Sequence, residues 1–117
     1  MRTTTHNGTD LLELDATGPL LVTEQDALDL IGATYGTEAD IIVVPLERLD
    51  PQFLELRSGI AGVFFQKLQN YQKRLVVLGD ISAAVAASKS LHDFVYETNR
   101  VGNHLFVPDR ETLLTRL

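Results

Sequence analysis

The sequence contains no cysteine and no tryptophan, and its 117 residues carry only 10 basic side chains against 16 acidic ones. The absence of cysteine excludes disulfide frameworks, thiolate zinc sites, iron–sulfur ligation and cysteine nucleophiles. With a net charge of -6 at pH 7, the chain offers no basic surface for a phosphate backbone or an anionic lipid. We therefore expect neither a nucleic acid nor a membrane as partner.

Long apolar runs are also missing. No run approaches the ~18 residues that a membrane helix needs. Residues 1–10 are polar and lack the apolar core of ~7–15 residues that defines a secretory signal. We therefore expect a cytoplasmic protein with a flexible tail at residues 1–10 and a single domain at residues 11–117.

The composition that remains is that of an ordinary globular domain, with 44% hydrophobic and 22% charged residues. For a chain of this mass, about 6,300 Å² of surface should stay exposed after folding, roughly one third of the surface of the unfolded chain. A hydrophobic core of that size needs no disulfide or metal to support it.

Apolar runs at residues 11–14 and 20–22 flank the turn signal Gly18-Pro19 and predict an antiparallel pair of strands. Thr23 then predicts the cap of a helix that ends at Gly36 and turns Leu28, Ile31 and Tyr35 toward the core. Continuous apolar runs at residues 41–44 and 75–78 are typical of strands covered on both faces.

Asp50-Pro51 predicts a capped turn, and a longer helix should follow from Ser58, with an apolar stripe at Ile60, Phe64, Leu68 and Tyr71. Further elements are a helix opened by Ser88, a strand at residues 105–107 and a terminal helix capped by Asp109. The order β-β-α-β-α-β-α-β-α predicts a single α/β domain with a mixed, mostly parallel five-stranded sheet and helices packed on it.

Ligands and partners of such sheets meet the loops that follow the carboxyl ends of the strands. Asp80 follows the predicted strand 75–78 and Gly79, so its carboxylate could serve as an acid, a base or a ligand anchor. The favoured alternative is that Asp80 caps the next turn through Ser82. Both interpretations stay open at this point.

Polar residues are dense in the predicted helix that begins at Ser88, where Ser90, Asp93 and Glu97 share one face. That face is either solvated or binds a partner or ligand. Together with the helix that begins at Ser58, these positions define a candidate binding surface. Its members are Ser58, Gln66, Lys67, Asn70, Asp80, Ser88, Ser90, Asp93, Glu97 and Asn99.

Signatures of catalysis are absent. There is no G-x-S-x-G motif, and His6, His92 and His104 have neither H-E-x-x-H nor i, i+4 spacing. Gly59 and Gly62 lack the Lys and Ser/Thr of a phosphate-binding loop. We therefore predict no catalytic residue, no metal site and no cofactor, and favour a protein that is not an enzyme.

Several polar pairs at fixed separations resemble the bacterial "domain of unknown function 4180" family over nearly the whole domain. The matching segments are Phe53 to Gly62, Gln66-Lys67, Asn70-Tyr71, Leu75 to Asp80, Ser88 to Leu91, Asp93-Phe94, Tyr96-Glu97 and Asn99. The resemblance implies a small bacterial cytoplasmic protein without an established activity.

The order of elements is also similar to that of the STAS domain, the fold of anti-sigma factor antagonists, and residues 41–62 resemble its third strand, loop and helix start. In that family a partner kinase phosphorylates a serine placed before a glycine, which implies that Ser58 is a possible phosphorylation site. The chain departs from the family pattern, because Leu56-Arg57 replaces the usual Asp-Ser and the loop from Pro45 is longer.

Three functional hypotheses follow. The first is a regulatory, protein-interaction module of STAS-like type. The second is a small-molecule binder or an unrecognised enzyme with a site around Asp80, in which Lys67 or Asn70 would position the substrate. The third is a structural homodimer that uses Phe65 or Tyr96 as its apolar contact.

Overall fold

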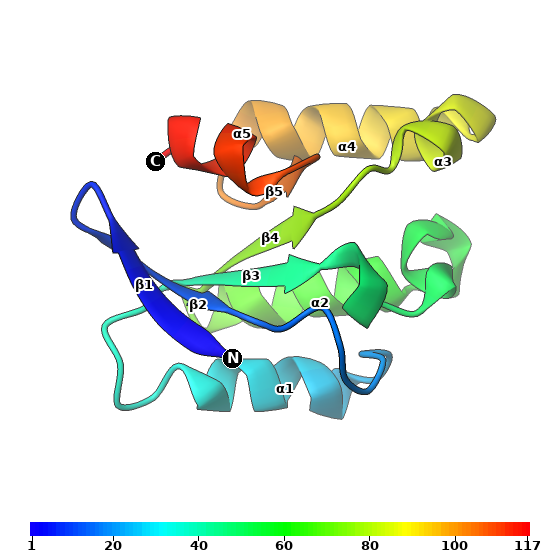
Figure 1. Ribbon diagram of the computed structural model, residues 1–117. Helices are drawn as coiled ribbons and strands as arrows, with labels where there is room; N and C mark the ends of the chain where they lie inside the picture. The colour runs from blue at the N-terminus through cyan, green and yellow to red at the C-terminus, as the bar shows by residue number, and fades with distance from the viewer.

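In the computed structural model, which describes residues 1–117, five strands and five α-helices build one α/β domain (Figure 1). The strands are β1 (Arg2–His6), β2 (Thr9–Glu13), β3 (Ile41–Pro45), β4 (Arg74–Leu78) and β5 (Leu105–Val107). The helices are α1 (Glu24–Ala33), α2 (Ile60–Asn70), α3 (Ser82–Ala87), α4 (Lys89–Val101) and α5 (Arg110–Thr115). Three 3-10 turns lie between β3 and α2, at Leu46–Arg48, Pro51–Leu54 and Leu56–Ser58.

The sheet has the order β1-β2-β3-β4-β5, with β1 antiparallel to β2 and all other neighbours parallel. The predicted mixed, mostly parallel five-stranded sheet is therefore confirmed. Each crossover moves to the next strand in the same direction, and right-handed crossovers of this kind place their helices on one face. None of the helices is long and apolar enough to cross a membrane.

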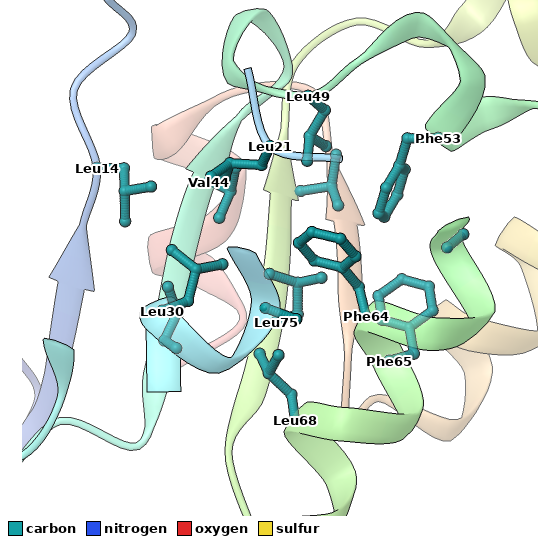
Figure 2. Packing of buried hydrophobic residues seen from close by; sticks show 14 of the residues in the cluster. Leu14, Leu21, Leu30, Val44, Leu49, Phe53, Phe64, Phe65, Leu68 and Leu75 are labelled. Atoms are coloured by element: carbon teal, nitrogen blue, oxygen red, sulfur yellow. The ribbon is translucent and has the colours of Figure 1, made fainter. Parts of the chain in front are cut away.

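That face carries the larger of two hydrophobic cores. Side chains of α1 and α2 pack on Ile42, Val44, Leu75, Val77 and Phe106 of the sheet, and Phe94 and Val95 of α4 pack against the same cluster. Figure 2 shows Phe53, Phe64 and Leu75 pointing toward one another from the loop, α2 and β4. The rings of Phe53 and Phe64 meet edge to face, with centroids 5.8 Å apart.

The opposite face holds a smaller core of alternate residues of the same strands. Leu113 of α5 is fully buried against them, although α5 has only 6 residues. The exposed surface of the whole chain is 6491 Å², close to the value of about 6,300 Å² expected for its mass. A chain without cysteine thus buries a core of ordinary size.

The prediction for α1 is confirmed at its start and wrong at its end. Thr23 and Asp26 form a capping box, with the Thr23 hydroxyl accepting from the Asp26 N–H at 3.1 Å. The helix ends at Ala33 rather than Gly36, because the next N–H groups, of Thr34 and Tyr35, bond to carbonyls three residues earlier instead of four, those of Ile31 and Gly32. Tyr35 lies beyond the helix and is exposed rather than part of the core.

The predicted flexible tail at residues 1–10 is wrong, and so is the strand pair at 11–14 and 20–22. Residues 2–6 form β1, which pairs with β2 across the two-residue turn Asn7-Gly8. Both turn residues have positive φ, 52° and 78°, as a tight hairpin requires. In the predicted strand 20–22, only Leu21 pairs with another segment, through an isolated β-bridge to Leu49. The Asn-Gly signal therefore outweighs Gly18-Pro19, whose proline lacks an N–H for pairing.

Two helices after β3 also differ from the prediction. α2 begins at Ile60, after Gly59 in the left-handed region with φ 80°, and Tyr71 at its end is exposed. The short helix α3 was not predicted, because its sequence of serine, alanine and valine has no apolar stripe. Asp50, Ser88 and Asp109 cap their helices or turns as predicted.

The core also contains a half-buried histidine. The ring of His104 stacks on Phe65 with centroids 4.9 Å apart, and its Nδ1 accepts a hydrogen bond from the Leu75 N–H at 2.9 Å. Burial lowers the pKa of His104, and the nearby positive charge of Arg74 lowers it further. The folded chain therefore holds His104 in its neutral form.

We expect the free energy of unfolding to fall between about pH 7.5 and 5.5, because the unfolded chain takes up a proton at His104 that the folded chain resists. This stabilisation is fully present above the ordinary value of 6.5 and is lost as the pH falls below it. Urea titrations across this pH range measure the slope of the free energy of unfolding against pH.

The test variant is His104→Asn, whose side-chain oxygen can still accept from the Leu75 N–H. The control variant is His92→Asn, at an exposed position. The first variant should lose a large part of the slope and the second should keep it. An unchanged slope in His104→Asn would contradict the assignment.

Candidate functional site

An apolar groove lies at the carboxyl ends of β3 and β4, between the loop of residues 46–59 and the helices α3 and α4. Figure 1 shows this loop and α3 at the same end of the sheet. The groove has a volume of about 490 Å³. It is lined by Leu46, Leu49, Asp50, Pro51, Leu54, Glu55, Ala84, Ser88 and Leu91.

The 3-10 turns explain why the loop presents apolar side chains to the groove. Asp50 accepts from the Gln52 N–H at 2.9 Å and begins the turn that Pro51 continues. Leu49 and Phe53 are buried and anchor this loop to the main core. Leu54, between these anchors and the charged residues that follow, is only partly buried.

A second hollow of about 380 Å³ continues the groove along the same loop. It shares Leu54, Glu55 and Ser88 with the groove and adds Leu56, Arg57 and Ser90. Glu55 and Arg57 are both exposed, and neither takes part in an ion pair. The apolar groove therefore ends in one free negative and one free positive charge.

Ser58 lies at the end of this loop, two residues before α2. Its hydroxyl donates to the Gln52 carbonyl at 2.7 Å and accepts from the Ile60 N–H at 3.3 Å. The side chain is exposed. Ser58 therefore ties the loop to the start of the helix and stays accessible to solvent.

Asp80 is not in the groove. Its carboxylate accepts from the Ser82 N–H at 2.9 Å at the start of α3. Hydrogen bonds from the Ser82 hydroxyl and the Ser82 N–H lower the pKa of Asp80. The residue faces a smaller hollow of about 220 Å³ beside β5. These contacts are those of a turn cap, one of the two roles predicted for this aspartate.

The candidate residues of α2 face α1 or solvent. Lys67 pairs with Glu24 of α1 at 2.8 Å, and the hydrogen bond to Glu24 raises the pKa of Lys67. Gln66 donates to Asn70 one turn along the same helix at 2.8 Å. The structure therefore does not bring Lys67 or Asn70 together with Asp80.

In α4, only the first turn contributes to the groove. Ser88 accepts from the Leu91 N–H at 3.2 Å as the helix cap, and Ser88 and Ser90 both line the hollow. Asp93 pairs with Lys89 at 3.0 Å on the exposed side. Glu97 pairs with Arg100.

Asn99 has a structural role that its sequence position did not indicate. Its side-chain amide donates to the Phe106 carbonyl at 3.0 Å and accepts from the Phe106 N–H at 2.8 Å. Both contacts are to the outer edge of β5. Asn99 thus holds α4 to the last strand of the sheet.

The two residues proposed as dimer contacts differ. Phe65 is buried among Phe53, Phe94, His104 and Phe106, so it offers no outer apolar surface. Tyr96 is 65% exposed on α4. Only Tyr96 keeps the surface position that the homodimer hypothesis requires.

Sequence reasoning missed a charged cluster at the carboxyl end of β2. Glu13, whose side chain is 7% exposed, binds Arg110 of α5 through two hydrogen bonds of 2.9 and 3.0 Å. Arg110 also lies 2.8 Å from the Nε2 of His6, and Thr4 donates to Glu13. The hydrogen bond from Arg110, followed by that from Thr4, lowers the pKa of Glu13 against the effect of burial.

This ion pair joins residues 97 positions apart and connects the first hairpin to the last helix. One sign of it in the sequence is an acidic residue within the apolar run Leu11-Leu12-Glu13-Leu14. Beside it lies a polar hollow of about 470 Å³, where the carboxyl ends of β2, β3, β4 and β5 meet. No group of three His, Asp or Glu side chains in the structure could hold a metal ion.

Comparison with known proteins identifies the family. Residues 6–117 match the family described as a domain of unknown function, DUF4180. The chain belongs to the DUF4180 family. No curated protein and no solved structure matches it significantly. The resemblance to this family is thereby confirmed, whereas the similarity of this DUF4180 chain to STAS domains stays a prediction.

Replacing Arg110 with leucine should destabilise the DUF4180 chain clearly more than Arg100→Leu, which removes an exposed pair with Glu97. The reason is that Arg110→Leu leaves the buried Glu13 carboxylate without its counter-ion. Urea unfolding of both variants at neutral pH measures the difference.

The pH dependence provides a second check. Because the pKa of Glu13 is lowered, the stability that the pair contributes is present above the ordinary value of 4.5 and is lost as the pH falls through the folded value. The difference in the free energy of unfolding between the parent chain and Arg110→Leu should therefore become smaller in acid. Equal effects of the two arginine substitutions at neutral pH would contradict this role.

Proposed function

We propose that this DUF4180 chain is a regulatory, protein-interaction module that binds a partner in the apolar groove. The observation that carries the proposal is the groove itself, at the carboxyl ends of two parallel strands, where the partly buried Leu46 and Leu54 lie beside the buried Leu49 and Leu91. This is the position where open α/β sheets commonly meet ligands and partners. The lining contains no arrangement of nucleophile, base and orienting acid.

The groove favours a particular kind of partner segment. Its apolar floor suits aliphatic or aromatic side chains, and Asp50 and Glu55 add negative charge at its rim. The net charge of -6 strengthens the attraction for a basic segment. We therefore propose a partner segment that combines apolar anchors with at least one lysine or arginine.

Regulation could act through Ser58, the position that the STAS resemblance implies for phosphorylation. Ser58 is exposed and directly follows Arg57, which lines the end of the groove. A phosphate on Ser58 would add about two negative charges there and would pair with the guanidinium of Arg57. STAS-like regulation is thus part of the proposal, and Ser58→Asp provides its phosphate mimic.

A second candidate function is binding of a small molecule in the same groove. The volumes of about 490 and 380 Å³ lie within the usual range for such sites. A thermal-shift screen of metabolites would then find a compound that stabilises the chain, by ~2.7 kcal/mol at 100 times its dissociation constant. That stabilisation must disappear when the groove is blocked.

The direct test of partner binding blocks the groove at Ala84. Ala84 of α3 lines the groove, whereas its neighbour Ala83 is exposed and does not line it. Arginine is a good helix former, so Ala84→Arg fills the groove with little cost to the helix, and Ala83→Arg is the matched control. Peptides selected from a random phage library on the parent chain serve as probes.

The selected peptides should share apolar anchors beside a basic residue and should bind Ala84→Arg at least about tenfold more weakly than Ala83→Arg. Isothermal titration measures both affinities. Peptides that bind both variants equally would show that the groove is not the binding site. A library that yields no binding peptide would also contradict the proposal.

A further inference from the structure

The two edges of the sheet differ in how their backbone groups are satisfied. On β5, the outward N–H and carbonyl of Phe106 are both bonded to the side-chain amide of Asn99. β5 is also only 3 residues long. Short length and a covering side chain are ordinary ways to protect an edge from pairing with another chain. This edge is therefore closed.

The β1 edge has no such protection. In the hairpin, the turn Asn7-Gly8 makes His6 and Thr9 a hydrogen-bonded pair, so Arg2 and Thr4 also direct their backbone groups toward β2. The Leu14 N–H bonds to Val43 of β3, which agrees with this alternation. Thr3 and Thr5 therefore direct their N–H and carbonyl groups outward, and no hydrogen bond to these groups occurs in the chain.

The residues of this edge suit pairing with a copy of the same strand. The strand Arg-Thr-Thr-Thr-His has threonine on both sides of Thr4 and a basic or imidazole side chain at each end. Threonine is favoured in strands, and pairs of threonine stabilise neighbouring strands. The strand has no acidic residue, so in a chain of net charge -6 it is a segment where two copies meet with little repulsion.

We propose that two copies of the chain associate through antiparallel pairing of their β1 strands. A two-fold axis passes beside Thr4, and Thr3 of one copy exchanges hydrogen bonds with Thr5 of the other. Arg2 then lies opposite His6 of the second copy. The sheet becomes continuous across both copies, and the arrangement is self-complementary, as a two-fold dimer requires.

This dimer does not use the groove, which lies beside α3 and α4 at the far side of the sheet from β1. Figure 1 shows β1 at an outer edge of the sheet. Each copy would keep its own groove free. The dimer would therefore present two grooves at once, and its formation does not depend on the proposed function.

Sedimentation of the full chain at concentrations from about 1 to 300 µM tests the proposal, with Thr5→Pro as the blocking variant and Thr5→Val as its control. Proline removes the outward N–H of Thr5 and leaves the bonds between β1 and β2 in place. Valine keeps that N–H and the branched side chain. Circular dichroism and urea unfolding confirm that both variants fold.

The parent chain and Thr5→Val should form dimers, and Thr5→Pro should raise the dissociation constant by more than about tenfold. Amide exchange gives an independent readout, because the Thr3 and Thr5 N–H groups should gain protection as the concentration rises. A parent chain that stays monomeric overturns the proposal. A dimer that survives Thr5→Pro, or a parent dimer whose Thr3 and Thr5 amides stay unprotected, also overturns it and would direct attention to Tyr96.

Discussion

The architecture depends on the right-handed crossover between parallel strands. Because β2, β3, β4 and β5 are added in one direction, each crossover places its helices on the same face of the sheet. That face gains the large aromatic core around Phe53 and Phe64. The loop after β3 and the helices after β4 then leave the sheet at neighbouring carboxyl ends, and the apolar groove forms between them.

The same constraint leaves the opposite face with little cover. It is closed by α5, which is too short to be stable alone and depends on Leu113 and on the bond from Arg110 to Glu13. Since Glu13 belongs to the first hairpin, the two ends of the chain stabilise each other. Hydrogen bonds to Glu13 from Arg110 and Thr4 satisfy a carboxylate that burial alone would destabilise.

Local signals in the sequence predicted the fold well, whereas contacts between distant residues could not be predicted. Thr23, Asp50 and Ser88 cap their elements as expected, because capping depends on residues two or three positions away. β1 was missed because its threonines give no apolar alternation. Of the candidate surface, Ser88 and Ser90 line the groove and its continuation, while Lys67 pairs with Glu24 of α1, a contact that only the packing of two helices reveals.

The central functional claim is that the apolar groove is the surface that a partner occupies. The most direct measurement is a leucine-methyl NMR titration of the chain with a peptide selected on the parent chain from the phage library. If the groove is the binding surface, the largest shifts occur at Leu46, Leu49, Leu54 and Leu91, and shifts are small at Leu105 and Leu113 of the opposite face. Largest shifts at the opposite face, or shifts spread evenly over both cores, would contradict it.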